Sequence, residues 1–441
     1  MGSWHYHCAL CGSTFEGAYY VSRKPRTARF LWRKQRDADF DAMVAAASNG
    51  KIDFRKFNEE SAAGEKNFDD ESLPSDEEDD LYDCDIISME DAIWSLHLQC
   101  LGVNRDSPLL ERAFLSDVGC SDSYGAVSAE PGSDPSAPDD LNEYSAYDLG
   151  DDEPLFPFHP KCFELFQQAV AFQRGFKVNA NPLPNGDWDL VVPCRDLDKD
   201  ALWEVFFNLK SDQRLEISYG EPEPPHDQYW LVNSGEELLI ADPGKRNPLA
   251  VNAIGDAWRE IDCPDSDPDI KSTEDPFAKL PFELVLLVTS ELPSRSLLDL
   301  LQASPHLRRG LGPSFSFWKR QFEKKMPWFY EMHSFLRDLS SSDSQEAREA
   351  PGKLTSHFFA WAYHTTTPRR GLKGPFMGIA NRRRIWEVCN QIVSPYLNQA
   401  KAEYSHSEVG EETQFRNSTV CLDMPVVTSP PLAHFHTERV F

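Results

Sequence analysis

The fold of the chain is decided by residues 277–322, FAKLPFELVLLVTSELPSRSLLDLLQASPHLRRGLGPSFSFWKRQF. Leu284, Leu287 and Val288 recur at the i, i+3 and i+4 spacing of one helical face. A second leucine-rich helix is expected to end at Pro305, and the segment FSFWKRQF predicts a third. Three helices this short cannot bury leucines on both sides against one another, so we expect a partner to cover part of their apolar surface.

This block resembles the F-box, the module that docks a substrate receptor onto the Skp-type adaptor of cullin–RING ubiquitin ligases. The resemblance implies that its aliphatic edge enters a groove of the adaptor. The expected adaptor-binding residues are Leu280, Pro281, Glu283, Leu284, Leu287, Val288, Leu292, Pro293, Leu297, Leu298 and Trp318. The sequence departs from the family at ASPHLRRGLGPSF, where the usual Ser-Arg-x-Trp is absent. An ordinary helical subdomain with the same apolar stripe is the alternative.

The longer chain resembles F-box-containing proteins of filamentous fungi. The matching segments are Cys8–Gly12, Leu98–Gly102, Phe156–His159 and the stretch FMGIANRRRIWEVCNQI, which begins at Phe376. The resemblance implies a non-catalytic subunit of an SCF-type ligase, which binds the Skp-type adaptor and cullin scaffold and recruits a protein target for ubiquitination. One alternative is an F-box-containing scaffold that acts outside the ligase, and another is an unrecognised enzyme domain at 176–261.

Composition and missing motifs narrow the function classes. With 44 Lys and Arg against 72 Asp and Glu, the 441-residue chain has a net charge of −28, which makes nucleic-acid or membrane-surface binding improbable. Phosphate-binding glycine loops, nucleophile elbows and the zinc-protease motif are absent from the sequence, so we predict no catalytic residues. The N-terminus shows no export signal, and we expect a cytoplasmic or nuclear protein, or one found in both places.

The chain is expected to be an α+β multidomain protein. A mixed α/β N-terminal region with Cys and His residues is predicted at 1–57 and 81–175, interrupted by an acidic disordered loop at 58–80. Alternation from Trp94 to Cys100 predicts a strand, and the segments WDLVV, RLEISYG and YWLVNSGEELLIADPG predict short strands. The remaining predicted units are a mixed α/β region at 176–261, a linker at 262–276, the central three-helix F-box at 277–325, a helical C-terminal region at 326–405 and a tail at 406–441.

Two short cysteine motifs predict a metal site. Cys8 and Cys11 form a C-x-x-C pair followed by Gly12, the spacing of a zinc knuckle. His159 and Cys162 have H-x-x-C spacing at the start of a helix predicted from Pro160. Together they make a treble-clef-like Cys3His set that suits a structural zinc ion. The alternatives are ordinary buried thiols with His159 capping the helix, or a redox C-x-x-C pair, although the thioredoxin-like βαβ context is missing.

The stretch from Arg369 to Arg384 carries six Lys and Arg residues and no acid, in a chain whose net charge is −28. Ile385, Val388 and Ile392 predict one face of a helix that begins near Asn381. We expect the arginines to form a solvated face, with pairing to an acidic segment of this chain or of a partner as the alternative.

Overall fold

The computed structural model describes residues 7–22, 81–121, 127–141, 154–184, 187–191, 197–211, 217–222, 232–261, 275–341 and 354–407. The predicted acidic loop at 58–80, most of the predicted linker at 262–276 and residues 408–441 of the predicted tail lie outside these described residues. The described stretches contain helices together with small antiparallel sheets, which confirms the prediction of a mixed α and β chain. None of their helices has the length and apolar character needed to cross a membrane.

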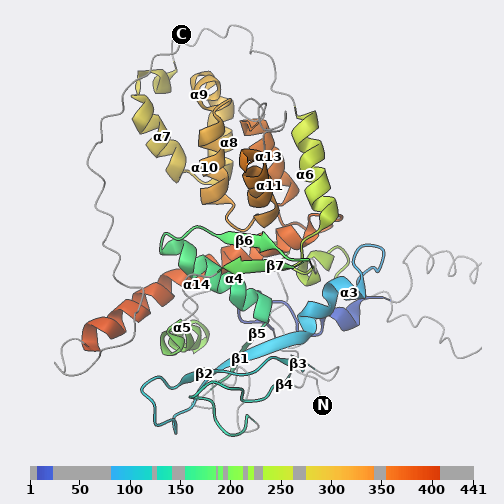
Figure 1. Cartoon of the computed structure of the whole chain (residues 1–441), viewed down its shortest axis with the longest axis vertical. Helices are drawn as coiled ribbons and strands as arrows, with labels where there is room; N and C mark the ends of the chain where they lie inside the picture. Colours follow the sequence, from blue (N-terminus) through green and yellow to red (C-terminus); the bar gives the residue numbers. More distant parts are fainter. Residues whose placement is uncertain are drawn as a thin grey trace, which may run out of the picture.

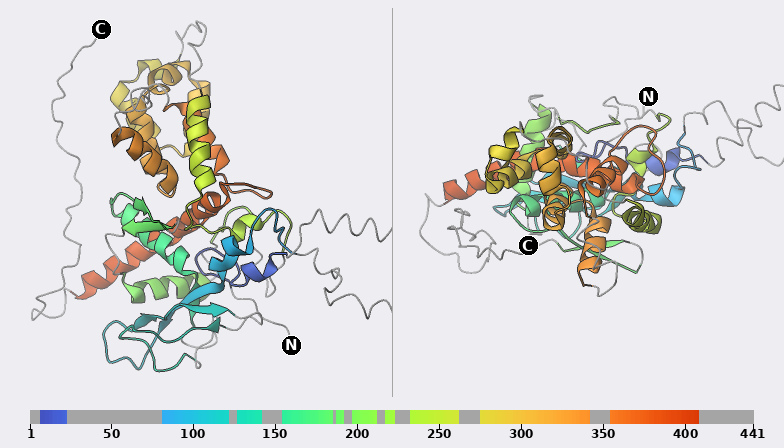
Figure 2. Two further views of the ribbon diagram at one scale, coloured as in Figure 1. Left: turned by 45° about the vertical axis from the view of Figure 1, so that its right-hand side comes forward. Right: turned by 90° about the horizontal axis from the view of Figure 1, so that it is seen from above.

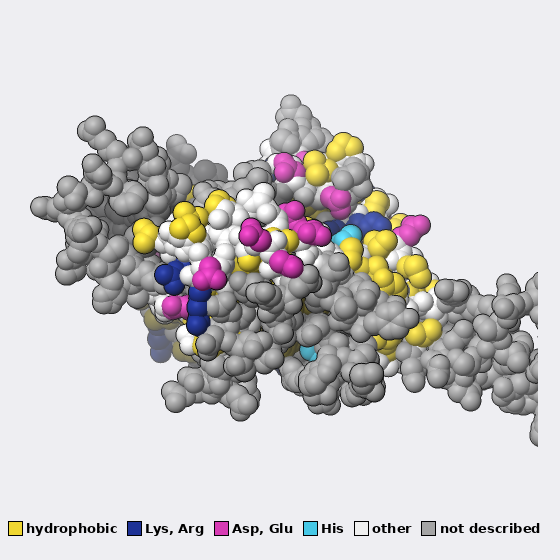
Figure 3. Space-filling view, turned by 90° about the horizontal axis from the view of Figure 1, so that it is seen from below, with side chains coloured by type: hydrophobic (Ala, Val, Ile, Leu, Met, Phe, Trp, Pro, Cys, Tyr) yellow, Lys and Arg dark blue, Asp and Glu magenta, His cyan; other side chains and the backbone are white. Residues whose placement is uncertain are grey.

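The described residues form a helical layer and an α/β layer, with the long helix α14 (Met377–Ser407) passing between them (Figure 1). The turned view at the left of Figure 2 shows the same order of layers. Ile385, Val388 and Ile392 of α14 are buried, as the predicted helical face required. Seen from below in Figure 3, acidic side chains spread over the middle of the described surface, in line with the net charge of −28.

The larger sheet is built around β1 (His97–Val103), which pairs antiparallel with β2 (Ala113–Leu115), β3 (Gly119–Ser121) and β5 (Phe156–Phe158). A short strand, β4 (Val127–Ser128), extends the β3 edge. The prediction that the strand begins at Trp94 is wrong. Residues Ile93–Leu96 form the 3-10 helix η3, preceded by α3 (Met89–Ala92), and the indole Nε1 of Trp94 donates to the carbonyl of Ile240.

Helices and a two-stranded sheet complete the α/β layer. The predicted helix after His159 is α4 (Pro160–Gln173), and α5 (Lys199–Ser211) packs against β1. The strand predicted from WDLVV is β7 (Trp188–Val191), which pairs with β6 (Asn179–Pro182). The prediction of a strand over YWLVNSGEELLIADPG is wrong at Glu237–Ile240, which form the 3-10 helix η4. Leu238, Leu239 and Ile240 are all fully buried, whereas a half-buried strand would expose alternate side chains.

The helical layer contains the block that resembles the F-box. The helices of this layer are α6 (Pro248–Glu260), α7 (Phe282–Glu291), α8 (Ser294–Ala303), α10 (Phe315–Lys325), α11 (Tyr330–Ser341) and α13 (Ser356–Thr365). The 3-10 helix η5 (Pro276–Lys279) precedes α7. The chain also forms a helix where we expected only a stop at Pro305, namely α9 (Pro305–Leu311). Pro305 occupies the first turn of α9, and the Ser304 hydroxyl accepts from the amide of Leu307, which caps it.

One contiguous apolar core joins the two layers. Most buried apolar side chains of the described residues belong to a single cluster that extends from Cys8 to Ala400. In the helical layer, the ring of Trp258 from α6 lies 5.4 Å from Phe335 and 5.2 Å from Phe358 between centroids. A smaller cluster surrounds η1 (Gly17–Tyr20) near the N-terminus. The block at 275–341 therefore shares its core with the rest of the chain.

The arginine run at 382–384 is part of this core. Arg382 is fully buried and donates to both carboxylate oxygens of Glu331, at 2.9 and 3.3 Å. Arg383 donates to the carbonyl of Tyr363 at 2.9 Å and lies over the ring of that residue. The prediction of a solvated face is therefore wrong for Arg382, Arg383 and Arg384, whose guanidinium groups bond to acceptors inside the protein. It holds for the other three basic residues of the stretch, Arg369, Arg370 and Lys373, which are exposed.

Candidate functional site

The N-terminal cysteine pair lies on a tight turn. Residues His7 and Thr14 form an isolated antiparallel bridge, and the turn between them carries Cys8 and Cys11. The amide of Gly12 donates to the carbonyl of Cys8 at 2.8 Å, and Gly12 has a φ of 71°, a conformation that favours glycine. This turn points both thiols to the same side, as the sequence predicted.

The second pair comes from the start of α4. His159 precedes the helix, Pro160 fills its first position, and Cys162 follows one turn later on the same side. The carbonyl of Pro157 in β5 accepts from the amide of Ala9, so the strand that leads into α4 is held against the cysteine turn. Two segments about 150 positions apart thus bring their ligand atoms together.

The four ligand atoms have the separations that a tetrahedral ion needs. Zinc bonds of about 2.3 Å to sulfur and about 2.0 Å to nitrogen place those ligands about 3.5 Å apart. The Sγ atoms of Cys11 and Cys162 lie 3.4 and 3.8 Å from His159 Nδ1. All four ligand atoms, Cys8 included, lie within 4.8 Å of one another. The prediction that these residues meet is confirmed, and the cluster is able to hold a metal ion.

Hydrogen bonds from and to the surrounding backbone fix the orientation of His159 and favour thiolates on the cysteines. His159 Nε2 lies 3.1 Å from the carbonyl of Ser95, which leaves Nδ1 with a lone pair directed at the thiols. The amide of Ser13 donates to Cys11 Sγ and the amide of His159 to Cys8 Sγ, both at 3.4 Å. Such N–H to sulfur bonds stabilise thiolates.

The three thiols shift one another's pKa values, because all of them are buried and lie close together. Burial raises the pKa of Cys8 and of Cys162 well above the usual value, and a hydrogen bond with Cys11 adds to each rise. Burial also acts to raise the pKa of Cys11, but hydrogen bonds with Cys162 and Cys8 and the electrostatic interaction with His159 lower it well below the usual value. The cluster therefore favours a thiolate on Cys11, and a divalent cation would displace the protons of the other two thiols.

The centre is closed to solvent. Cys8, Cys11, His159 and Cys162 have no exposed surface. The rings of Phe15 and Trp94 lie 4.6 and 4.7 Å from the His159 ring between centroids. Four protein ligands in a dry pocket complete a tetrahedron and leave no position for a substrate, which is the arrangement of a structural site.

Arg384 of α14 ties the cysteine turn to the rest of the core. Its guanidinium donates to the carbonyl of Cys11 at 2.6 Å and to the hydroxyl of Ser13 at 3.2 Å. Further bonds reach the carbonyl of Tyr219 and the side chain of Asn381. Among the described residues, no carboxylate lies within ion-pair distance of Arg384 although the side chain is buried.

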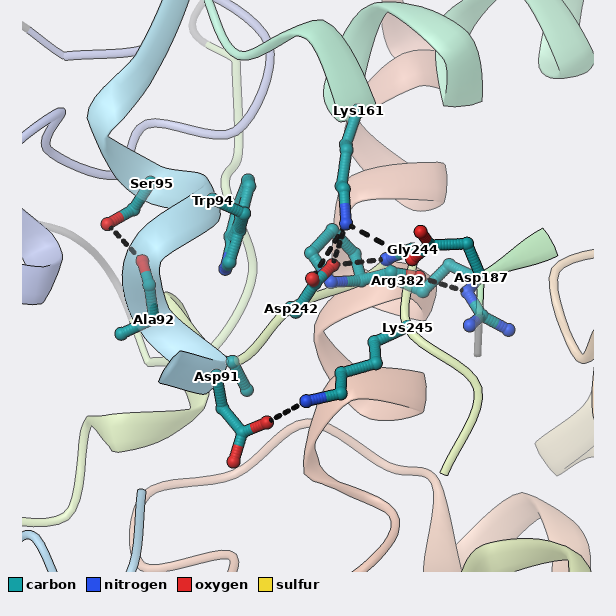
Figure 4. A network of polar contacts seen from close by, with 12 residues as sticks. Asp91, Ala92, Trp94, Ser95, Lys161, Asp187, Asp242, Gly244, Lys245 and Arg382 are labelled. Carbon is teal, nitrogen blue, oxygen red and sulfur yellow. Dashed lines mark hydrogen bonds and ion pairs between the residues drawn. The ribbon is translucent and has the colours of Figure 1, made fainter. Parts of the chain in front are cut away.

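Charged groups beside the centre are paired (Figure 4). Lys161, in the first turn of α4, has its Nζ 2.9 and 2.7 Å from the two carboxylate oxygens of Asp242. Lys245 Nζ lies 2.6 Å from Asp91 in α3, which precedes η3. These pairs fasten the loop that follows η4 to the start of α4, which carries His159 and Cys162, and to α3.

The second predicted site divides into exposed and buried residues. Leu280, Leu284, Leu287 and Val288 are 40, 47, 61 and 43% exposed, and we call these four residues the α7 face. Pro281, Glu283 and Pro293 are also exposed, and Leu292 is half-buried. The other three predicted adaptor-binding residues are buried inside the chain, namely Leu297, Leu298 and Trp318.

Sequence reasoning missed several residues that build these sites. The Ser95 carbonyl and Arg384 contact the Cys/His cluster, and Phe282, 53% exposed, lies beside the α7 face. The run Arg382–Arg384 directly precedes the apolar helical stripe that begins at Ile385, and this position could have indicated that the guanidinium groups are buried. Nothing in the sequence marks the carbonyl of Ser95.

Comparison with known proteins returned no match to a family model, to a curated protein or to a solved structure. The assignment of function therefore depends on the geometry of the chain itself.

Proposed function

We propose that the chain is a non-catalytic F-box subunit that binds a Skp-type adaptor through the α7 face and brings a protein target to an SCF-type ubiquitin ligase. The observation that carries this proposal is the row of four exposed aliphatic side chains formed by three residues of α7 and by Leu280 just before it. Leu284, Leu287 and Val288 follow the i, i+3, i+4 spacing, and Leu280 lies in extended backbone two residues before the helix begins. Apolar stripes of this kind on a surface mark protein interaction sites.

The opposite side of α7 supports the exposed row. Val285 is 3% exposed and Thr289 is 1% exposed, and the Thr289 hydroxyl donates to the carbonyl of Val285. Leu297 and Trp318, which the resemblance placed at the adaptor, pack in the core below. We assign them a supporting role, because Trp318 Nε1 donates to the carbonyls of Leu311 and Gly312 at 3.0 and 2.9 Å.

The energy available from the α7 face suits a reversible interaction. Fully burying a leucine contributes about 1.5–3 kcal/mol, and these side chains are roughly half exposed, so each adds about 1 kcal/mol on binding. Four of them offset only part of the cost of association. Contacts from the neighbouring Pro281, Glu283 and Pro293 would supply the remainder and fix the orientation.

The test is capture of a purified Skp-type adaptor, with and without its cullin, by the full chain. A Leu284→Glu, Leu287→Glu variant is expected to lose capture by at least about tenfold, because two carboxylates would be desolvated in the interface. Leu249→Glu is the matched control, since Leu249 of α6 is 65% exposed and lies outside the α7 face. Equal capture by both variants, or none by the unchanged chain, would overturn the proposal. Capture of the adaptor but not of cullin would favour a scaffold outside the ligase.

We propose in addition that the ion held by Cys8, Cys11, His159 and Cys162 is zinc. Three thiolates and one imidazole are a common structural set for Zn²⁺, and such a centre has a net charge of −1. The buried guanidinium of Arg384, which has no carboxylate partner among the described residues, supplies the compensating charge.

Elemental analysis of the purified protein tests the zinc proposal. We expect one zinc per chain, with loss of the metal and a lower melting temperature in Cys162→Ser. Cys120→Ser is the control, because Cys120 is exposed and lies outside the cluster. A metal-free protein whose melting temperature is unaffected by zinc and by chelators would contradict the proposal.

A further inference from the structure

A cleft lies where the helical layer meets the α/β layer. In Figure 1, β6 lies between α4 and the lower ends of α10 and α11. The residues that line the cleft place it at this junction. Its volume is about 530 Å³. Its lining residues are Phe172, Gly175, Phe176, Lys177, Val178, Ala180, Lys319, Arg320, Glu323, Lys324, His333, Leu336, Arg337 and Ser340. We call this the α10–α11 cleft.

The walls of the α10–α11 cleft are basic. Five Lys and Arg side chains and a single carboxylate, Glu323, line it. The whole chain has a net charge of −28, so the charge of this cleft is opposite in sign to that of the chain. A cleft lined by one sign of charge raises the local concentration of ligands of the opposite sign.

Part of that charge is available for a ligand. Glu323 is engaged by Lys177 at 2.9 Å, and Lys324 pairs with Glu291 outside the cleft at 2.7 Å. Arg320 is exposed, and among the described residues it forms no ion pair or hydrogen bond. Within the part of the chain that the structure describes, the half-buried Lys319 beside it donates only to a hydroxyl, that of Ser340 at 3.4 Å.

The inner surface of the cleft is apolar. Phe172 and Val178 are half-buried, and Leu336 of α11 is 2% exposed. His333 adds no positive charge at neutral pH, because burial lowers the pKa of its imidazole. Its Nε2 lies 2.9 Å from the carbonyl of Met326, which fixes the ring. The cleft therefore combines a cationic rim with an apolar base.

We infer that the α10–α11 cleft binds a short acidic peptide segment of a protein partner, with an apolar side chain of that segment on the cleft base and its carboxylates on Lys319 and Arg320. A cleft of this volume accommodates a few residues of an extended peptide. A long polyanion such as single-stranded DNA fits less well, because the surrounding chain would repel it. This inference rests on the proposed function, since the partner would be the recruited target.

Fluorescence anisotropy with the full chain tests the inference. The probe is a short fluorescein-labelled peptide in which glutamates flank a central leucine–phenylalanine pair. We expect saturable binding that weakens by about tenfold or more in Arg320→Glu and that falls with added salt. Lys373→Glu is the matched control, because Lys373 is exposed, lies outside the cleft and makes the same change of charge. A peptide with serines in place of the apolar pair should bind more weakly.

The outcomes separate this inference from the adaptor proposal. Arg320→Glu should keep adaptor capture, and Leu284→Glu, Leu287→Glu should keep peptide binding, because those two leucines do not line the cleft. Equal loss in Arg320→Glu and Lys373→Glu would overturn the inference, as would no binding to the unchanged chain. Tighter binding of a fluorescein-labelled oligothymidylate than of the peptide would also overturn it and indicate a nucleic-acid site.

Discussion

At the scale of single residues, Arg384 fixes the position of the turn that carries Cys8 and Cys11. Its guanidinium contacts the carbonyls of Cys11 and Tyr219 and the hydroxyl of Ser13 within the core. We expect Arg384→Met to destabilise the fold by about 3 kcal/mol or more, since several buried acceptors lose their donor. We also expect faster loss of metal from the folded protein to a colorimetric chelator, because the negative centre loses its compensating charge.

Arg383→Met is the control for that experiment. Arg383 is also buried, but its partners are Tyr363, Thr367 and Glu387, away from the cysteine turn. This variant should be destabilised without faster metal release from the folded fraction. Similar release rates in the two variants would show that Arg384 acts on overall stability alone.

The same residues show what the sequence could predict at this scale. The pairs Cys8 with Cys11 and His159 with Cys162 were recognisable because each has ligand spacing within one turn of chain. The role of Arg384 could not be predicted, because its bond to Cys11 joins positions 373 residues apart. Buried guanidinium partners depend on tertiary contacts that no local pattern encodes.

At the scale of elements, the position of the α7 face depends on a cap shared by two helices. Asp275 accepts from the amide of Phe277 at the start of η5, from the Ser304 hydroxyl at 2.6 Å and from the amide of His306 in α9. Burial acts to raise the pKa of Asp275, but these hydrogen bonds, led by that of Ser304, lower it. A depressed pKa stabilises the fold above the unfolded value near 4, and this contribution disappears as the pH falls through the folded pKa.

We expect Asp275→Ala to loosen η5 and the start of α7 and to weaken adaptor capture by about threefold to tenfold, in keeping with about 1 kcal/mol for a lost cap. Hydrogen exchange should speed up at the amides of Phe277 and His306. Asp256→Ala is the control, because Asp256 is an exposed residue of α6 whose partner among the described residues is Arg259. Unchanged exchange at both amides would contradict the role of the cap.

Elements with a regular apolar period were predictable, and those shaped by tertiary contacts were not. The stripes of α4, α7 and α14 and the strand β7 appear where the sequence placed them. The 3-10 helix η4 replaced a predicted strand because three consecutive side chains are buried and the carbonyls of Leu239 and Ile240 accept from Ser13 and Trp94. Periodicity alone cannot identify an apolar segment that is buried on every side.

For the molecule as a whole, the continuity of the core means that an ion bound by the Cys8–Cys162 cluster, as proposed, should stabilise helices far from it. The apolar cluster that contains Cys8 and Cys162 also contains Leu297 of α8 and Trp318 of α10. Between the layers, the ring of Trp188 in β7 lies 5.8 Å from that of Tyr330 in α11 between centroids, and Arg337 of α11 donates to the carbonyl of Ala180 in β6 at 3.0 Å. These contacts predict cooperative unfolding of the two layers.

Hydrogen exchange in Cys162→Ser measures that cooperativity. We expect the amides of α4 and those of α8 to lose protection together and by the same free energy, because opening one layer exposes the core of the other. Cys120→Ser, at an exposed cysteine of β3, should leave both helices protected. If protection falls in α4 while α8 keeps its value, the metal centre stabilises the α/β layer alone. The block that carries the α7 face would then unfold as a separate unit despite sharing its core.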